Sequence, residues 1–347
     1  MTRVYEIDPI EDVRWQQFLE GHPLATLFHS KPWLEALHRT YGYRASVLTS
    51  SSPGERLTAG LVFCRVQSWL TGRRLVSLPF SDHCTPLVNS HEQFGFLFSR
   101  LQQEADQGNQ KYFEIRPISG GARVPGDLSP SKTFCLHRLD LRPSLNELSR
   151  SLHADCIRRK ITRAQREGVT YEDGATEELL HKFYHLTVLT RRRQRIPPQP
   201  LSWFRNLLAC MPEGAKIRLA SSHGEPAAAI LTIRYKSCMT YKYGCSDPKF
   251  HKLGCMQLLM WKAIQEAKEN GLSEFDLGRT EWDNEGLLAF KDRWGAARST
   301  ILYLRHPAPK PQRRTQSGLR RFGDQVFALA PDCFLTTAGN ILYRHFA

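Results

Sequence analysis

Asp276 is the carboxylate whose position in the sequence best suits chemistry. It lies in the segment Glu274-Phe-Asp-Leu, where polar and apolar residues alternate as in a half-buried strand. Its side chain therefore points to the face opposite Phe275 and Leu277. A carboxylate placed in this way can bind a substrate or remove a proton. It can equally be a structural charge paired with Arg279 or Arg293.

Three further residues are candidates because of their position in the sequence. Asp82 is in Pro79-Phe-Ser-Asp-His, a loop after an expected strand, where functional residues concentrate and where turn aspartates are equally common. Gly254 lies where a polar loop meets a helix, a place that can bind phosphate or be an ordinary junction. Lys291 lies on a short amphipathic segment, which by itself indicates a surface lysine.

The charge distribution points to an anionic partner. The 347-residue chain has a formal net charge of +14, which favours nucleic acid, a phosphorylated ligand or an anionic membrane. Residues 142–166 contain seven Arg or Lys and two acids, and residues 305–321 contain six basic residues and no acid. Arg191-Arg-Arg-Gln-Arg is a third cluster. Each cluster alone is also typical of a solvated surface. No nucleic-acid-binding motif accompanies them.

Several protein classes are disfavoured by composition. The nine cysteines are scattered and contain no Cys-x-x-Cys pair, so we expect reduced thiols, no metal site and no disulfide framework. The sequence contains no run of about 20 apolar residues, so no membrane span is expected. The N-terminus lacks a charged-then-apolar signal pattern. These features predict a cytoplasmic protein with room for about two domains.

The second half of the chain must position most of these residues. Two apolar runs on either side of Tyr235-Lys-Ser-Cys predict an antiparallel strand pair, followed by a polar loop over residues 247–254. A helix follows, with apolar residues at helical spacing as far as the stop signal Asn270-Gly271. A strand at Glu274–Leu277, a short helix at Glu285–Lys291 and a strand at Arg298–Leu304 complete the unit.

The first half predicts a similar order of elements. Strands are expected at residues 43–48, 57–66, 75–80, 111–116 and 133–141, and a helix at residues 93–107. Between the halves, Ile157–Gly168 predicts a basic helix ended by Gly168. The two halves share this architecture although their sequences hardly match.

Four segments of the second half resemble the FemAB-like, or Fem-type, branch of the GNAT acyltransferase superfamily. They are Tyr243-Gly-Cys-Ser, Ala267-Lys-Glu-Asn-Gly, Phe275-Asp-Leu-Gly and the block from Gly286 to Gly295. This branch includes peptidoglycan bridge aminoacyltransferases and exopolysaccharide-associated proteins. The resemblance implies a mixed α/β (α+β) fold of two tandem GNAT-like units. We expect an N-terminal unit over residues 1–143, a catalytic unit over 144–305 and a basic, apolar tail over 306–347.

The resemblance also implies roles for individual residues. Phe290-Lys291 matches a Phe-Lys pair that is implicated in stabilising the charge of the transfer reaction, so Lys291 is a predicted catalytic residue. Asp276, singled out by its place on the strand, is the second. The remaining candidates bind the acceptor: Asp82, Tyr243, Arg279, Trp282 and Phe290.

The predicted cofactor loop departs from the family pattern. GNAT enzymes bind the CoA pyrophosphate on a (Gln/Arg)-x-x-Gly-x-(Gly/Ala) loop, and the matching stretch here is His251-Lys-Leu-Gly-Cys-Met. Gly254 is kept, whereas Met256 replaces a small residue. Lys252, Gly254 and Cys255 are therefore the predicted binding residues for an acyl-CoA donor. The tRNA-contacting coiled-coil insertion of some Fem enzymes is not visible, which disfavours an aminoacyl-tRNA donor.

The function implied is transfer of an acyl or aminoacyl group to an amine or hydroxyl of a cell-envelope or exopolysaccharide precursor. A non-catalytic GNAT-like protein that binds such a precursor is the alternative. The expected partners are an anionic donor and a lipid-linked or cell-envelope acceptor. The tail from Arg305 combines basic and apolar residues, so it predicts either contact with the inner face of the cytoplasmic membrane or packing on the body of the protein.

Overall fold

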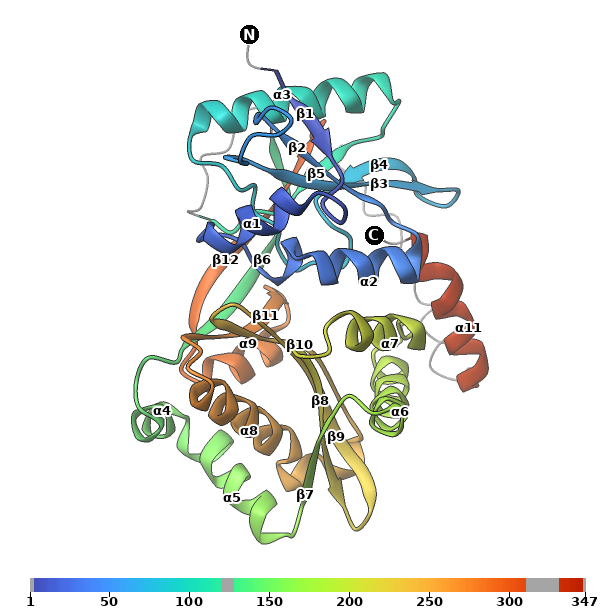
Figure 1. Ribbon diagram of the computed structural model, residues 1–347. Coiled ribbons are helices and arrows are strands. Elements are labelled where there is room, and N and C mark those ends of the chain that lie inside the picture. Colours follow the sequence, from blue (N-terminus) through green and yellow to red (C-terminus); the bar gives the residue numbers. More distant parts are fainter. Residues whose placement is uncertain (1–2, 120–127, 310–330, 346–347) are drawn as a thin grey trace. The chain divides into compact units, whose positions relative to one another are not determined.

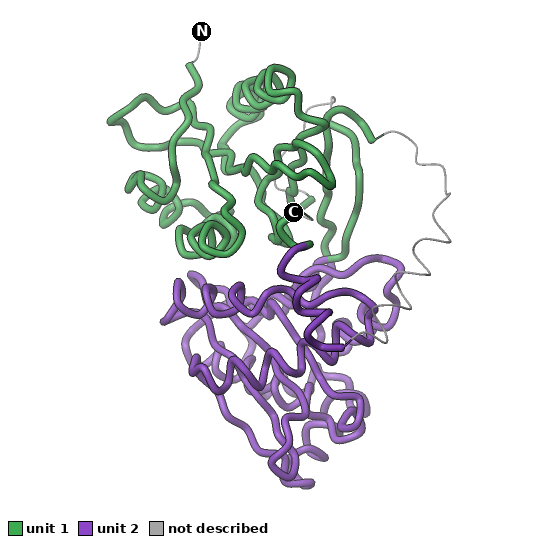
Figure 2. Tube along the Cα trace, turned by 90° about the vertical axis from the view of Figure 1, so that its right-hand side faces the viewer, with its two compact units in different colours: residues 1–135, 299–312, 342–347 green, residues 136–298, 313–341 purple. Residues whose placement is uncertain are grey.

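The computed structural model describes residues 3–119, 128–309 and 331–345. The chain forms two compact units (Figure 2). Unit 1 contains residues 1–135, 299–312 and 342–347, and unit 2 contains residues 136–298 and 313–341. In the described residues the chain passes between the units at residues 135–136, 298–299 and 341–342. The boundaries expected at 143 and 305 remain predictions. Each unit contains part of a mixed sheet, covered by helices (Figure 1).

The sheet of unit 1 is largely antiparallel. Its strands lie in the order β1-β2-β3-β4-β5-β12-β6, and β4 and β5 form a parallel pair. The strands are β1 (Tyr5–Ile7), β2 (Ala45–Thr49), β3 (Leu61–Ser68), β4 (Gly72–Val76), β5 (Phe113–Ile115), β6 (Ser129–Asp140) and β12 (Ala297–His306). Strands β6 and β12 contribute residues to both units.

The helices of unit 1 begin at capping residues. They are α1 (Val13–Gly21), the short 3-10 helix η1 (Leu27–His29), α2 (Lys31–Tyr41) and α3 (His91–Gln107). Asp12 and Ser90 accept backbone N–H groups at the starts of α1 and α3. Helix α3 buries Phe94, Leu97 and Leu101, whose spacing of three and four residues places them on one face.

One predicted strand of unit 1 is wrong. The sequence predicts a strand over residues 75–80, but β4 ends at Val76. Leu78 and Phe80 have left-handed backbone conformations, with φ of 54° and 59°, which a strand does not allow. Arg116 donates a hydrogen bond to the carbonyl of Leu78 at 2.8 Å. Side-chain contacts therefore hold this segment as a loop.

Unit 2 contains the strands from β6 to β7 of the strand order, with β10 and β11 parallel. Its strands lie in the order β6-β11-β10-β9-β8-β7. The new strands are β7 (Thr170–Gly174), β8 (Ala215–Ser222), β9 (Glu225–Tyr235), β10 (Cys238–Ser246) and β11 (Glu274–Glu281). Strand β7 was not expected, because Thr170-Tyr-Glu-Asp-Gly has no apolar alternation. It lies at the sheet edge, where β8 supplies the hydrogen bonds that define it.

Helices cover both faces of this part of the sheet (Figure 1). They are α4 (Leu145–Ser151), the π-helix η2 (Ala154–Arg158), α5 (Arg159–Arg166), α6 (Glu177–Arg193), α7 (Leu201–Cys210), the 3-10 helix η3 (Pro248–Leu253), α8 (Cys255–Glu269) and α9 (Glu285–Asp292). Helices α4, α5 and α8 share one hydrophobic core with β9 to β11. Helix α6 packs on the other face of β8, β9 and β10.

The C-terminal segment ends in α11 (Asp332–Leu342) and the 3-10 helix η4 (Tyr343–His345). The basic residues of the expected membrane-binding tail, from Arg313 to Arg321, lie outside the described residues. Within the described ranges, no helix combines the length and the apolar character needed to cross a membrane.

Candidate active site

The candidate site of unit 2 lies where β10 and β11 stop pairing. The two strands run parallel, and their ladder contains three residue pairs, from Cys238–Glu274 to Thr240–Asp276. Strand β10 stays paired with β9 as far as Ser246. The β10–β11 ladder therefore ends in the middle of both strands. The candidate residues on these strands lie at its last pair or beyond it.

Lys291 is buried and its ammonium group is fixed to the backbone of β11. The side chain is 2% exposed. Its Nζ donates to the carbonyl of Gly278 at 2.7 Å and to that of Arg279 at 3.2 Å. Helix α9 positions Lys291, and Asn284 caps that helix by accepting the N–H of Leu287. These bonds hold a positive charge next to the segment that carries Asp276.

Asp276 lies two residues before that glycine and is also buried, at 4% exposure. Its Oδ1 accepts the backbone N–H of Gly278 at 2.7 Å, and Gly278 has a φ of 72°, in the region that favours glycine. The Nε of Arg138 lies 4.0 Å from Oδ2. Asp276 and Lys291 thus bind the N–H and the carbonyl of the same residue of β11, Gly278.

A histidine beside this cluster was not singled out from the sequence. His137 on β6 is fully buried, and its Nε2 lies 3.1 Å from Oδ1 of Asp292. Burial lowers the pKa of His137 and nearby Lys291 acts in the same direction, whereas the hydrogen bond to Asp292 opposes both. Burial therefore favours the neutral form of His137, next to the candidate cation.

Tyr243 is held in place by residues of helix α7. A bulge in β10 between Tyr241 and Tyr243 shifts the register with β9, and bulges of this kind re-aim side chains. The Nε1 of Trp203 on α7 donates to the Tyr243 hydroxyl at 2.8 Å. Phe204 packs edge-on against the same ring. Trp203 is thus a supporting residue that the sequence pattern did not reveal.

The predicted cofactor residues surround the start of α8. Gly254 has a left-handed φ of 84°, and a Cβ on it would lie 2.4 Å from the carbonyl oxygen of Lys160. Helix α5 therefore approaches this loop so closely that a side chain at position 254 does not fit. Cys255 is buried, and burial raises the pKa of its thiol to about 11. Its side chain belongs to the core, and only its backbone lies at the helix start.

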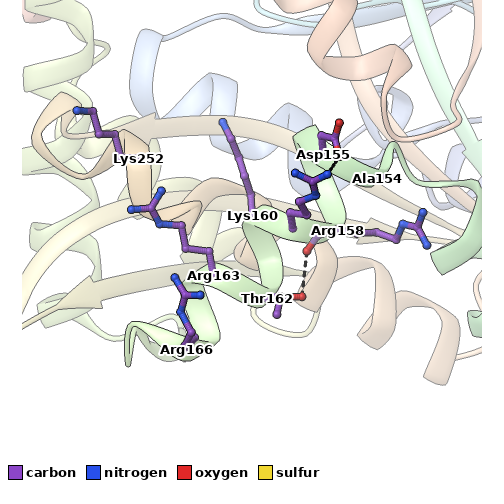
Figure 3. A pocket seen from close by; sticks show the side chains of 9 residues that line it. Ala154, Asp155, Arg158, Lys160, Thr162, Arg163, Arg166 and Lys252 are labelled. Carbon is purple, nitrogen blue, oxygen red and sulfur yellow. Dashed lines mark hydrogen bonds and ion pairs between the residues drawn. The ribbon is translucent and has the colours of Figure 1, made fainter.

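Lys252 faces a cavity of about 690 Å³ along η2 and α5 (Figure 3). Six of its nine lining residues are basic and one is acidic. They are Arg158, Arg159, Lys160, Arg163, Arg166, Lys252 and Asp155. Arg159 pairs with Asp155, and Arg163 and Arg166 lie near Glu167. Within the described residues, Arg158, Lys160 and Lys252 have no carboxylate partner.

The remaining candidates are more scattered. Asp82 belongs to unit 1, and its backbone carbonyl accepts the hydroxyl of Tyr303 at 3.0 Å. Trp282, just after β11, is 42% exposed. Phe290 packs against the core of unit 2, with its ring beside Trp294. The side chain of Arg279 is exposed.

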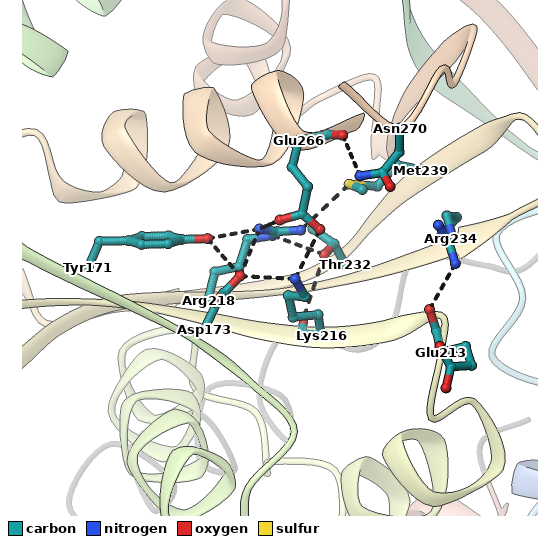
Figure 4. A network of polar contacts seen from close by, with 10 residues as sticks. All are labelled: Tyr171, Asp173, Glu213, Lys216, Arg218, Thr232, Arg234, Met239, Glu266 and Asn270. Atoms are coloured by element: carbon teal, nitrogen blue, oxygen red, sulfur yellow. Dashed lines mark hydrogen bonds and ion pairs between the residues drawn. The ribbon is translucent and has the colours of Figure 1, made fainter. Parts of the chain in front are cut away.

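A second polar cluster on unit 2 has the character of a structural network (Figure 4). Arg218 on β8 is 1% exposed. Its Nη1 donates to Glu266 at 2.7 Å and to the Tyr171 hydroxyl at 2.8 Å. Lys216 lies 3.0 Å from the same glutamate. The buried guanidinium is therefore matched by acceptors, as buried charges require.

Residues 153–292 match the family model described as an acetyltransferase (GNAT) domain. The crystal structure of FemX is similar over 86% of this chain and 96% of its own, with a TM-score of 0.64 and 15% identity. The C-terminal (DUF2156) domain of a putative lysylphosphatidylglycerol synthetase from Agrobacterium fabrum is similar over 90% and 95%, with a TM-score of 0.58 and 16% identity. No curated protein matches the sequence.

A tandem GNAT protein from the clavulanic acid biosynthesis pathway is similar over 89% of this chain and 99% of its own, with a TM-score of 0.55 and 13% identity. These comparisons confirm the predicted α/β fold of two tandem GNAT-like units and the resemblance to the FemAB-like branch. The residues that match this GNAT model, 153–292, lie within unit 2.

GNAT domains typically use acyl-CoA, and the residues around α8 fit the phosphates of such a donor. Arg158 at the end of η2, Lys160 on α5 and Lys252 on η3 line one cavity. Within the described part of the chain, no group of His, Cys, Asp or Glu side chains is arranged to hold a metal ion.

Proposed function

We propose that the protein transfers an acyl group from acyl-CoA to an amine or hydroxyl of a cell-envelope or exopolysaccharide precursor. The observation that carries this proposal is the buried Lys291 ammonium, fixed on β11 beside Asp276 within a GNAT domain. The acceptor class is supported by the fold shared with FemX and with the lysylphosphatidylglycerol synthetase domain.

Residues of β11 and α9 would have separate roles in the reaction. When bound, acyl-CoA supplies an activated thioester, whose C–S bond breaks as the acceptor nitrogen or oxygen bonds to the carbonyl carbon. Lys291 stabilises the negative charge that develops on the carbonyl oxygen. Asp276 binds the acceptor or takes the proton that it loses. Tyr243, Trp282 and Phe290 supply apolar surface for the acceptor.

The cavity along α5 would hold the phosphates of the donor. Arg158, Lys160 and Lys252 are the three lining cations without a carboxylate partner among the described residues. An anionic ligand can therefore bind them without breaking an existing ion pair. Gly254 allows α5 to lie against the start of α8. Lys160 on α5 and Lys252 on η3 can then act on one phosphate group.

Acceptor-dependent release of CoA thiol from acyl-CoA tests this function. Wild-type protein should release thiol when a pool of soluble and lipid-linked envelope precursors is added. The Arg158→Gln, Lys160→Gln double variant should bind CoA at least about tenfold more weakly, because each charge-assisted hydrogen bond is worth about 1.5–3 kcal/mol. Arg44→Gln with Arg56→Gln removes the same charge from exposed positions of unit 1 and should bind CoA like the wild type.

A non-catalytic binding protein is the second candidate. The departure from the usual phosphate loop, with Met256 in place of a small residue, favours it. Retention of CoA or of a precursor without thiol release would support this candidate. Transfer from aminoacyl-tRNA but not from acyl-CoA would keep the acyltransferase and replace the donor.

A further inference from the structure

The turn between β3 and β4 carries the most exposed of the large hydrophobic side chains in the described part of the chain. Trp69 is 78% exposed, and the adjacent Leu70 is 45% exposed. The two residues form the tip of a hairpin whose strands pair from Ser68–Gly72 inwards. Single exposed apolar residues are common. A tryptophan next to a leucine at a protruding tip needs another explanation.

The tip is ordered rather than loosely exposed. The hydroxyl of Ser68 accepts the backbone N–H groups of Leu70 and Thr71 at 3.2 and 3.0 Å. The Nε1 of Trp69 donates to Nε2 of His345 at 3.0 Å, and His345 is 7% exposed. The polar atom of the indole is therefore satisfied by the protein, while the apolar body of the ring faces solvent.

Hydrogen bonds to His345 hold the turn in place. The hydroxyl of Thr71 donates to the carbonyl of His345 at 2.9 Å, and Arg74 donates to the same carbonyl at 3.0 Å. Lys111 donates to the carbonyl of Thr71 at 3.0 Å. This bracing fixes the direction of Trp69 before any partner binds, which lowers the entropic cost of binding.

Basic residues surround this apolar tip. Arg73, Lys111 and Arg344 are exposed, on the hairpin, before β5 and in η4. The segments that build the tip, residues 68–74, Lys111 and residues 343–345, contain no acidic residue. A compact apolar point inside a basic rim matches the surface of an anionic bilayer, where tryptophan favours the interface and each Lys or Arg adds attraction.

We propose that the β3–β4 turn docks the protein on anionic membranes, with Trp69 and Leu70 in the interface and Arg73, Lys111 and Arg344 on the lipid head groups. Two apolar side chains are far smaller than a stable protein interface, which buries about 800 Å² per partner. They suffice for reversible membrane binding when charge adds to burial. The proposal stands independently of the acyl-transfer chemistry.

Co-sedimentation with vesicles tests the proposal. Wild-type protein should bind vesicles of phosphatidylcholine with phosphatidylglycerol, and binding should weaken with added salt. The Trp69→Ser, Leu70→Ser variant keeps every charge and should bind at least about tenfold more weakly. The matched control Val13→Ser, Leu24→Ser removes two other exposed apolar residues of unit 1, which are 65% and 37% exposed, and should bind like the wild type.

Fluorescence quenching by brominated lipids locates the contact. Wild-type tryptophan emission should fall on brominated anionic vesicles, and the Trp69→Phe variant should lose most of that quenching while still binding. Circular dichroism confirms that each variant is folded. The proposal is overturned if wild-type protein does not bind at low salt. It is also overturned if the Trp69→Ser, Leu70→Ser variant binds like the wild type, or if quenching persists in Trp69→Phe.

Discussion

Replacing Lys291 by Met should affect both turnover and stability. Methionine keeps a flexible, unbranched side chain of similar size and removes the ammonium group. In the wild type this group donates to the carbonyls of Gly278 and Arg279 at 2.7 and 3.2 Å, and the residue is 2% exposed. The substitution therefore leaves two carbonyls of β11 without this donor. Both lie a few residues after Asp276 on the same strand.

The size of both effects follows from this geometry. Hydrogen bonds to charged groups contribute about 1.5–3 kcal/mol each, while removing a buried ammonium recovers part of its desolvation cost. A net loss of about 2 kcal/mol in the free energy of unfolding is expected. For a unit of this size it lowers the melting temperature by about 4–8 °C. Loss of a group that stabilises the developing oxyanion should lower turnover about 100-fold or more.

Calorimetry and acceptor-dependent thiol release would measure the two effects on the same preparation. Lys262→Met on α8 is a matched control, because Lys262 is exposed and should change neither quantity. A variant at Lys291 that melts lower but keeps full turnover would make this residue purely structural. Unchanged melting would contradict the buried position of its ammonium group.

Three further predictions concern unit 2. Although burial raises the pKa of Glu266, hydrogen bonds from Arg218 and other cation contacts hold it at about 2. The resulting stability is present above the ordinary pKa of 4.5 and should be lost as the pH falls from about 4.5 to 2, by up to about 3 kcal/mol. Chemical denaturation of Glu266→Gln across this range should show a much flatter pH profile. Gly254→Ala should cost at least about 2 kcal/mol in thermal unfolding, since it combines a left-handed backbone with a contact to Lys160; unchanged melting would contradict that close approach. Asp276→Asn keeps an acceptor for the N–H of the nearby glycine, so stability should change by less than about 1 kcal/mol, whereas turnover should fall at least about tenfold; full turnover would remove this carboxylate from the chemistry.

Periodicity in the sequence predicted the long elements well. Helices α3 and α8 have apolar residues at helical spacing, so local pattern and tertiary burial agree. Strand β7 escaped prediction because its hydrogen bonds come from β8 and not from any apolar pattern of its own. The loop at Leu78 and Phe80 escaped because Arg116, distant in sequence, holds it.

The sequence singled out candidate site residues but could not give their geometry. Resemblance singled out Lys291, whereas local pattern alone indicates a surface lysine on a short helix. Its burial depends on carbonyls contributed by β11, which no local pattern reveals. The same holds for the approach of Lys160 to Gly254 and for the support of Tyr243 by Trp203. These are tertiary contacts between segments far apart in the chain.

Mass spectrometry of the acceptor tests the central claim most directly. Purified protein would be incubated with isotope-labelled acyl-CoA and an extract of envelope and exopolysaccharide precursors. The account predicts a precursor whose mass increases by the labelled acyl group with wild-type protein, and at least about 100-fold less of this product with Lys291→Met. A protein that retains CoA and a precursor, yet yields no labelled product from any acyl-CoA, would contradict the account and identify a binding protein.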